Sequence, residues 1–296
     1  MLHTPQHARP YRLFYRKQCA TVRNGREVNI SGLKLIGGVL GLALTLGPPL
    51  QSQFVVKLQP QTVSEFERYV QSVEEQINER WQGKKSFLAL GDDPASKQKV
   101  LAGEFAIREL PNGHPVDVKD GLVHDWMGAV YIPRTRMERV LEVLRDFDRH
   151  KEIYPDVADS RTIRRNGNDV TGYWRLQRKG IVPVVLNVEQ DAHYQQVSPD
   201  RWTCRAYARN ITEIDANLFT RGRKFPLGEG HGYLWRLYAY WSLESFRGGV
   251  LGECRTVSLS RDIPEGLAWA VGPYVQKAPY DSLLSTLRET RKVASQ

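Results

Sequence analysis

Six strand-length segments follow one another in the second half of the chain, and their short connections restrict the fold more than any other feature. Two earlier strands are predicted at residues 105–110 and 122–132, and the six later ones at 160–165, 169–178, 182–194, 201–214, 233–246 and 250–262. Turn-forming pairs such as Asn166-Gly167 and Gly248-Gly249 separate most of these strands and are too short to hold a crossover helix. Neighbouring strands must therefore run antiparallel.

Helical periodicity flanks the six strands. Apolar residues three and four apart predict one helix over 135–150 and a last helix over 265–293, in which Pro273 and Pro279 predict a break or kink near the middle. A single antiparallel sheet with helices at both ends of its sequence covers one face with them. The sequence therefore predicts an α+β fold, in which a curved sheet and the long C-terminal helix leave a cavity between them.

A further amphipathic helix is predicted ahead of the sheet, over 62–81, because apolar residues recur there at intervals of three and four. Thr62 and Glu65 fit a capping box at its start, and Gly83 fits its C-terminal end. The segment 181–188 is apolar on both faces except at Asn187 and needs cover on both sides, so we expect this extra N-terminal helix to lie on the outside of the sheet.

The N-terminal residues 1–52 resemble a signal peptide. Six of the nine net positive charges lie ahead of the apolar run 35–46, which has the length of a secretory core and is short for a membrane span of about 20 residues. Ser52 is a possible cleavage site, but Leu50 is large for the −3 position, so an uncleaved membrane anchor at 35–46 remains the alternative. We expect an exported protein, periplasmic or anchored facing the periplasm of a bacterium. The rest of the chain is close to electrically neutral, so its charge does not favour a nucleic-acid partner.

The rest of the chain divides into residues 53–102, an N-terminal helix and linker, and 103–296, one sheet-and-helix domain. Two cysteines follow the leader, Cys204 and Cys254, and either a disulfide or two buried free thiols fit their positions. Residues 53–296 contain no nucleophile-elbow, zinc-ligand or phosphate-loop motif, so the sequence gives no reason to expect a catalytic residue, a metal or a cofactor.

Aromatic residues on the strands are the most informative candidates for a binding site. Alternation places Tyr233, Trp235, Leu237, Ala239, Trp241 and Leu243 on one face of a strand, with the small Ala239 leaving room. The candidate ligand-binding residues are Trp126, Trp174, Leu176, Trp235, Leu237, Trp241, and Trp269 and Tyr274 of the last helix. Candidate polar pocket residues are His124, Tyr173, Arg175 and Arg236. His124 could donate a proton to a ligand carbonyl, or be an ordinary hydrogen-bonded strand histidine.

Several short segments carry a family resemblance. They are Leu144-Arg145-Asp146-Phe147, Tyr154-Pro155-Asp156-Val157 with Ser160, the entry to the last helix at 258–264, and Leu283, Leu284, Leu287 and Arg288 within it. With the order of elements over 122–293, they resemble the START-like helix-grip superfamily, also called SRPBCC, which includes lipid-transfer domains and polyketide cyclases. The resemblance implies an internal cavity for an apolar small molecule or lipid. The alternatives are a polyketide cyclase or aromatase that uses His124, Tyr173, Arg175 and Arg236, and a membrane-anchored structural module.

Overall fold

A computed structural model describes residues 55–179, 183–215, 222–263 and 268–296, and for 268–276 it describes the backbone alone. The predicted leader, with its cleavage site and the apolar run 35–46, lies outside these residues. No helix within the described residues is long and apolar enough to cross a membrane.

One large antiparallel sheet dominates the fold. Its strands are β2 (Ala106–Leu110), β3 (Val116–Val118), β4 (Gly121–Pro133), β5 (Val157–Asn166), β6 (Asp169–Arg178), β7 (Val184–Ser198), β8 (Arg201–Ile214), β10 (Arg236–Phe246) and β11 (Gly249–Arg261). Their order is β2-β4-β11-β10-β8-β7-β6-β5, with β3 also paired to β4. The strand predictions are confirmed to within a few residues, because tight turns and alternation are local signals. A small separate pair joins β1 (Val56–Lys57) to β9 (Glu229–Gly230).

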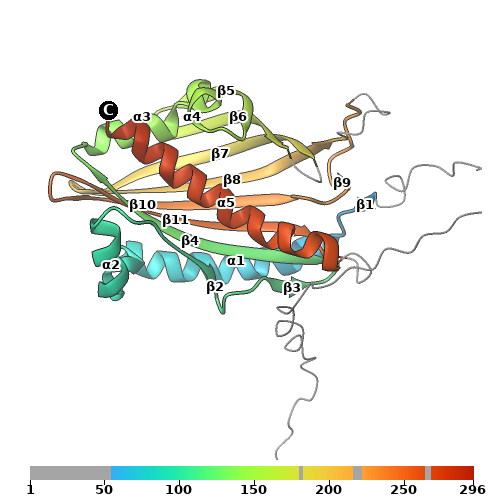
Figure 1. The fold of residues 1–296 in the computed structure, drawn as a ribbon, viewed down its shortest axis with the longest axis horizontal. Coiled ribbons are helices and arrows are strands. Elements are labelled where there is room, and N and C mark those ends of the chain that lie inside the picture. Colours follow the sequence, from blue (N-terminus) through green and yellow to red (C-terminus); the bar gives the residue numbers. More distant parts are fainter. Residues whose placement is uncertain (1–54, 180–182, 216–221, 264–267) are drawn as a thin grey trace, which may run out of the picture. The chain divides into compact units, whose positions relative to one another are not determined.

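Helices cover both faces of the sheet. They are α1 (Pro60–Trp81), α2 (Pro94–Leu101), α3 (Met137–Arg145), α4 (His150–Ile153) and α5 (Ala268–Ala294), with 3₁₀ turns η2 (Ala89–Asp92) and η3 (Phe147–Arg149). Figure 1 shows α5, in red, crossing the strands obliquely, while the fainter α1 lies behind them. Leu283 and Leu287 of α5 share a core with Trp241, which defines the inner face of the sheet. Phe66 of α1 shares another with Tyr238, which defines the outer face.

Three details of the helices differ from the sequence predictions. The helix predicted over 135–150 ends at Arg145 and continues as η3 and α4. Of the break or kink predicted in the last helix, the break is wrong, because α5 runs through Pro273 and Pro279 without interruption.

The third difference is the capping box. Helix α1 begins at Pro60, so Thr62 lies inside the first turn, and the Glu65 carboxylate accepts the Lys119 backbone N–H at 2.7 Å. The predicted C-terminal end is confirmed. Gly83 has φ +79°, and the hydrogen bonds from Gly83 N to Arg80 O and from Lys84 N to Glu79 O form a Schellman motif.

Two glycines on the inner face let neighbouring elements approach closely. A Cβ on Gly128 of β4 would lie 2.6 Å from Leu287 Cδ1, and one on Gly172 of β6 would lie 1.9 Å from Phe147 Cδ1. Ordinary carbon contacts lie at about 3.5–4.0 Å, so any larger residue would push α5 or η3 off the sheet.

Polar contacts fix α1 to the outer face. The Tyr238 hydroxyl donates to Glu67 Oε1 at 2.6 Å, and those of Tyr207 and Tyr240 donate to Glu74 Oε1 at 2.5 and 3.0 Å. At the centre of this interface, Arg255 donates to both carboxylate oxygens of the fully buried Asp125, at 2.9 and 2.6 Å, and Tyr69 adds a third donor at 2.8 Å. Such bonds satisfy polar groups that a covered sheet face would otherwise leave without partners.

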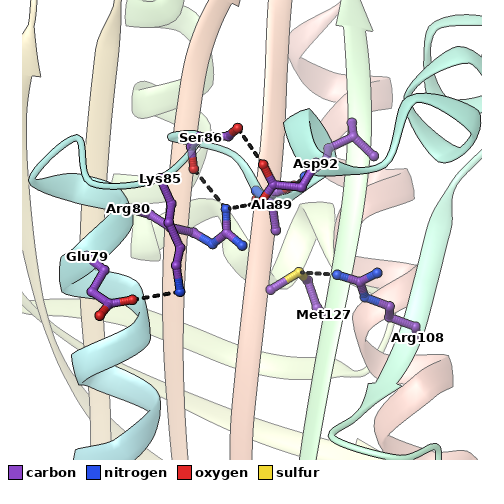
Figure 2. A network of polar contacts seen from close by, with 10 residues as sticks. Glu79, Arg80, Lys85, Ser86, Ala89, Asp92, Arg108 and Met127 are labelled. Carbon is purple, nitrogen blue, oxygen red and sulfur yellow. Dashed lines mark hydrogen bonds and ion pairs between the residues drawn. The ribbon is translucent and has the colours of Figure 1, made fainter.

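The C-terminal end of α1 is held to the segment that follows it (Figure 2). Arg80 donates to the Ser86 carbonyl at 2.9 Å and pairs with Asp92 at 2.7 Å, while the Ser86 hydroxyl donates to the same carboxylate at 2.5 Å. Lys85 pairs with Glu79 at 2.7 Å. The network ties α1 to η2 and so positions the start of α2.

Candidate functional site: a cavity beneath the C-terminal helix

The described residues enclose a cavity of about 790 Å³ between the inner face of the sheet and α5. Its walls come from β4, β5, β6, β7, β8, β10 and β11, from α3, α4 and η3, and from the middle of α5. The volume falls within the range of about 300–1,000 Å³ that is typical of small-molecule sites.

Small side chains at the middle of the sheet create the space. Ala192, Ala206, Ala239 and Thr256 are cross-strand neighbours in one row of β7, β8, β10 and β11, and all four line the cavity. The adjacent row carries Tyr194, Cys204, Trp241 and Cys254 and closes the cavity at that side. A row of three alanines and a threonine leaves a hollow where larger residues would meet α5.

The structure brings four of the eight apolar candidates to the cavity wall. Trp174, Leu176, Leu237 and Trp241 line it. Trp126 also points toward α5, but its ring packs edge-on against Tyr280, with centroids 5.6 Å apart, and it is not part of the wall. The side chains of Trp269 and Tyr274 lie outside the described residues.

Trp235 is misplaced by the sequence prediction. It packs in the outer-face core with Phe66 and Tyr240. Strand β10 begins only at Arg236, and both Tyr233 and Leu234 line the cavity, so the alternation that holds within β10 does not extend back to residue 235.

Three of the four polar candidates also lie away from the cavity. Tyr173 and Arg175 of β6 both donate to Asn187 Oδ1, at 2.9 and 3.1 Å, on the outer face. Arg236 donates to the backbone carbonyls of Arg209 and Trp235. On β6, Trp174 and Leu176 point inward, so their neighbours Tyr173 and Arg175 must point outward.

The fourth polar candidate, His124 of β4, does line the cavity and is 2% exposed. Its Nε2 lies 3.1 Å from the Ser260 hydroxyl, and its Nδ1 is buried with no hydrogen-bond partner among the described residues. Burial lowers the pKa of His124 to about 4, so the ring is neutral near pH 7.

Several polar residues of the wall were not predicted, and two of them make contacts that shape it. Arg178, at the end of β6, joins the sheet to α5: it pairs with Asp156 at 3.1 Å and donates to the Ala278 carbonyl at 3.1 Å and the Ser282 hydroxyl at 2.8 Å. Glu213 of β8 bonds both Nδ1 and the backbone N–H of His231. Gly230, with φ +140°, makes room for this carboxylate, since a Cβ there would lie 2.8 Å from Glu213 Oε2. No sequence spacing links these residues.

The two cysteines are buried free thiols. Each is the cross-strand neighbour of Trp241, one on either side, so their backbones are about 10 Å apart. A disulfide needs Cα atoms within about 7 Å. Burial raises the pKa of Cys204 to about 12, which leaves its thiol protonated and unreactive. Among the described residues, no group of three His, Cys, Asp or Glu side chains could hold a metal ion.

No protein-family description matches the chain, and no curated protein resembles it in sequence. Similar solved structures include a STAR-related lipid transfer protein from Xanthomonas axonopodis, with 20% identity, coverage of 60% of this chain and 98% of that one, and a TM-score of 0.41. Human STARD10 has 11% identity, 68% and 80% coverage and a TM-score of 0.40. A Streptomyces aromatase/cyclase has 8% identity, 58% and 93% coverage and a TM-score of 0.38.

The described residues have the predicted α+β architecture, in which a large antiparallel sheet carries a C-terminal helix across its inner face.

Proposed function

We propose that the protein binds and carries an apolar small molecule or lipid in the cavity beneath α5. One observation carries the proposal: the inner face leaves about 790 Å³ lined mostly by aliphatic and aromatic side chains, while the part of the outer face beneath α1 is filled by a packed core. An apolar ligand would recover the contacts that the small residues Ala192, Ala206 and Ala239 leave unmade.

The test is uptake of a fluorescent fatty probe by protein from which lipid has been extracted. The wild-type protein should bind the probe with one site per chain. The double variant Ala206→Leu/Ala239→Leu fills the centre of the cavity and should reduce the affinity at least tenfold, whereas Ala95→Leu on the exposed surface of α2 is the matched control and should not. Equal binding by the two variants would place the probe elsewhere and contradict the proposal.

The cyclase alternative loses support from the same geometry. Tyr173, Arg175 and Arg236, three of the four residues on which it rested, bond to partners outside the cavity. Of the four residues named for it, only His124 lies at the cavity wall.

We further propose that the carrier acts outside the cytoplasm, directed there by the leader at residues 1–52. The basic stretch and the apolar run 35–46 support this. Cell fractionation followed by N-terminal sequencing is the test. A soluble periplasmic chain that begins near residue 53 supports a cleaved signal peptide, and an intact chain in the membrane fraction supports an anchor, as a membrane-anchored structural module would need. An intact chain in the cytosol would contradict export.

A further inference from the structure

The hydrogen bonds around His124 determine which of its ring nitrogens carries the proton. Ser260 lies beside it on β11, and the Ser260 hydroxyl donates to the Arg261 carbonyl at 3.1 Å. A hydroxyl has a single proton, so toward His124 Nε2, 3.1 Å away, the same oxygen can only accept. Nε2 therefore carries the hydrogen. This is the one assignment that makes both bonds.

Nδ1 is consequently a lone-pair acceptor. A second proton on the ring is disfavoured, because burial lowers the pKa of His124 to about 4. The protein provides no donor to this acceptor within the described residues. A buried polar atom without a partner is costly and rare in folded proteins, and an unmet one in a cavity wall indicates a group that the cavity is built to receive.

The neighbours of His124 on β11 are hydroxyl side chains. Ser258 is its cross-strand neighbour on β11, and Thr256, Ser258 and Ser260, at alternate positions of that strand, all line the cavity. Hydroxyls of this kind tolerate a neutral polar group and provide no fixed charge to balance an ionised one.

We propose that His124 Nδ1 accepts a hydrogen bond from a hydroxyl group of the ligand, so that the cargo is an apolar alcohol or phenol with its polar end at β4 and β11. This inference rests on the proposed carrier function and names its ligand class. A ketone, ester or ether presents only acceptors and would leave two lone pairs facing each other. A carboxylate or phosphate would bring a buried negative charge to the same acceptor. The hypothesis that His124 donates to a ligand carbonyl is therefore replaced by one in which His124 accepts a hydrogen bond from the ligand.

The experiment compares two probes that differ in one donor: a pyrene-labelled long-chain alcohol and its methyl ether. Fluorescence titration of the wild-type protein should give an affinity about tenfold higher for the alcohol, which is the usual effect of one buried hydrogen bond. In His124→Phe, which keeps a planar ring but lacks the acceptor, the ratio of the two affinities should fall to about one, while the ether binds as before.

The outcomes separate the two proposals. If wild-type protein takes up neither probe, both the carrier function and the hydroxyl site are overturned. If it binds both equally, the carrier function stands and the hydroxyl site is overturned. If Thr256→Val, and not His124→Phe, abolishes the preference for the alcohol over the ether, the ligand hydroxyl binds to Thr256. The proposal for His124 is then overturned as well.

A spectroscopic measurement on the unaltered chain covers the case in which His124→Phe does not fold. With ¹⁵N-labelled histidine, the unprotonated Nδ1 resonance of His124 should move when the alcohol is added and should stay in place with the ether. The assignment would be overturned if the chemical shift showed a protonated Nδ1 before any ligand is added, or if the Nδ1 resonance did not move when the alcohol is added.

Discussion

The two faces of strand β10 are built from opposite kinds of side chain. On the outer face, Tyr238 and Tyr240 fill the space beneath α1, and their hydroxyls end on carboxylates of that helix. On the inner face, Leu237 and Ala239 leave space before α5, and Trp241 and Leu243 pack in the core that the strand shares with α5. Adjacent residues of one strand thus serve a packed interface and an open cavity.

The difference shows how the fold sustains a hollow. Walls of a cavity lose dispersion contacts, so the stability of the domain must come from elsewhere. The outer interface contributes an apolar core and a buried Arg255–Asp125 pair, and the inner face contributes the core around Trp241, Leu283 and Leu287 beside the cavity. Variants that weaken the outer face should therefore reduce stability, and variants of the inner face should change ligand binding first.

The largest effect is expected at the centre of the outer face. Asp125→Ala leaves the Arg255 guanidinium buried without its counter-ion, and we expect the free energy of unfolding to fall by about 3–5 kcal/mol in urea denaturation. The double variant Asp125→Ala/Arg255→Met removes the orphaned charge and should recover much of the loss. If the free energy of unfolding of Asp125→Ala lay within about 0.5 kcal/mol of the wild-type value, the outer face would not be where the stability resides.

The next largest effect is expected from acid, which should lower the free energy of unfolding through His124 on the inner face. The pKa of His124 is lowered from 6.5 to about 4 by burial, so between these pH values the unfolded chain holds a proton that the folded chain does not. Stability is then fully present above pH 6.5 and is lost as the pH falls toward 4, by about 1.4 kcal/mol per pH unit and about 3 kcal/mol in all.

The control for this acid effect is His124→Phe, in which that part of the pH dependence should vanish. The outer face behaves differently, because burial raises the pKa of Tyr238 to about 12 and its hydroxyl keeps its proton throughout the acid range. Its contribution is lost only as the pH rises from 10 through about 12. Identical acid profiles of the free energy of unfolding for wild type and His124→Phe would contradict this division.

Local patterns predicted the strands and the sorting of residues into two faces, but not which face was hollow. Alternation along β6 puts Tyr173 and Arg175 opposite Trp174 and Leu176, but it does not tell which pair faces the cavity, because the inner face is defined only by where α5 packs. Gly128 and Gly172 carry that information, through the close approach of Leu287 and Phe147, but a glycine in a strand does not reveal its neighbour.

Contacts between distant segments could not be predicted at all. The Arg178 bonds to Asp156 and Ser282 and the Glu213–His231 pair join residues with no fixed spacing. The error at Trp235 has a different origin: the alternating pattern was carried past the true start of β10, where Gly232, with φ +73°, turns the chain.

A pair of adjacent substitutions on β10 makes the comparison sharper. Tyr240→Leu removes a packed ring and its bond to Glu74, and we expect a loss of about 2–3 kcal/mol in the free energy of unfolding without a change in probe affinity. Ala239→Leu projects into the cavity and should leave the stability unchanged or raise it by up to about 1 kcal/mol, while it weakens probe binding. Denaturation and probe titration of both variants are the test. If Tyr240→Leu weakened probe binding and Ala239→Leu lowered the free energy of unfolding, the assignment of the two faces would be wrong.

The smallest effect is expected from a reductant. Cys204 and Cys254 flank Trp241 on the inner face as separate thiols, so a reducing agent has no bond to break and should change the free energy of unfolding by less than about 0.5 kcal/mol. Both thiols should resist alkylation in the folded protein, since burial raises their pKa values, and both should react once the chain unfolds. Mass spectrometry after alkylation distinguishes the cases. A folded chain two mass units lighter than the reduced one would contain a disulfide between Cys204 and Cys254. Forming it would require β10 to be displaced from between the two cysteines, and with it the cavity floor that separates the two faces.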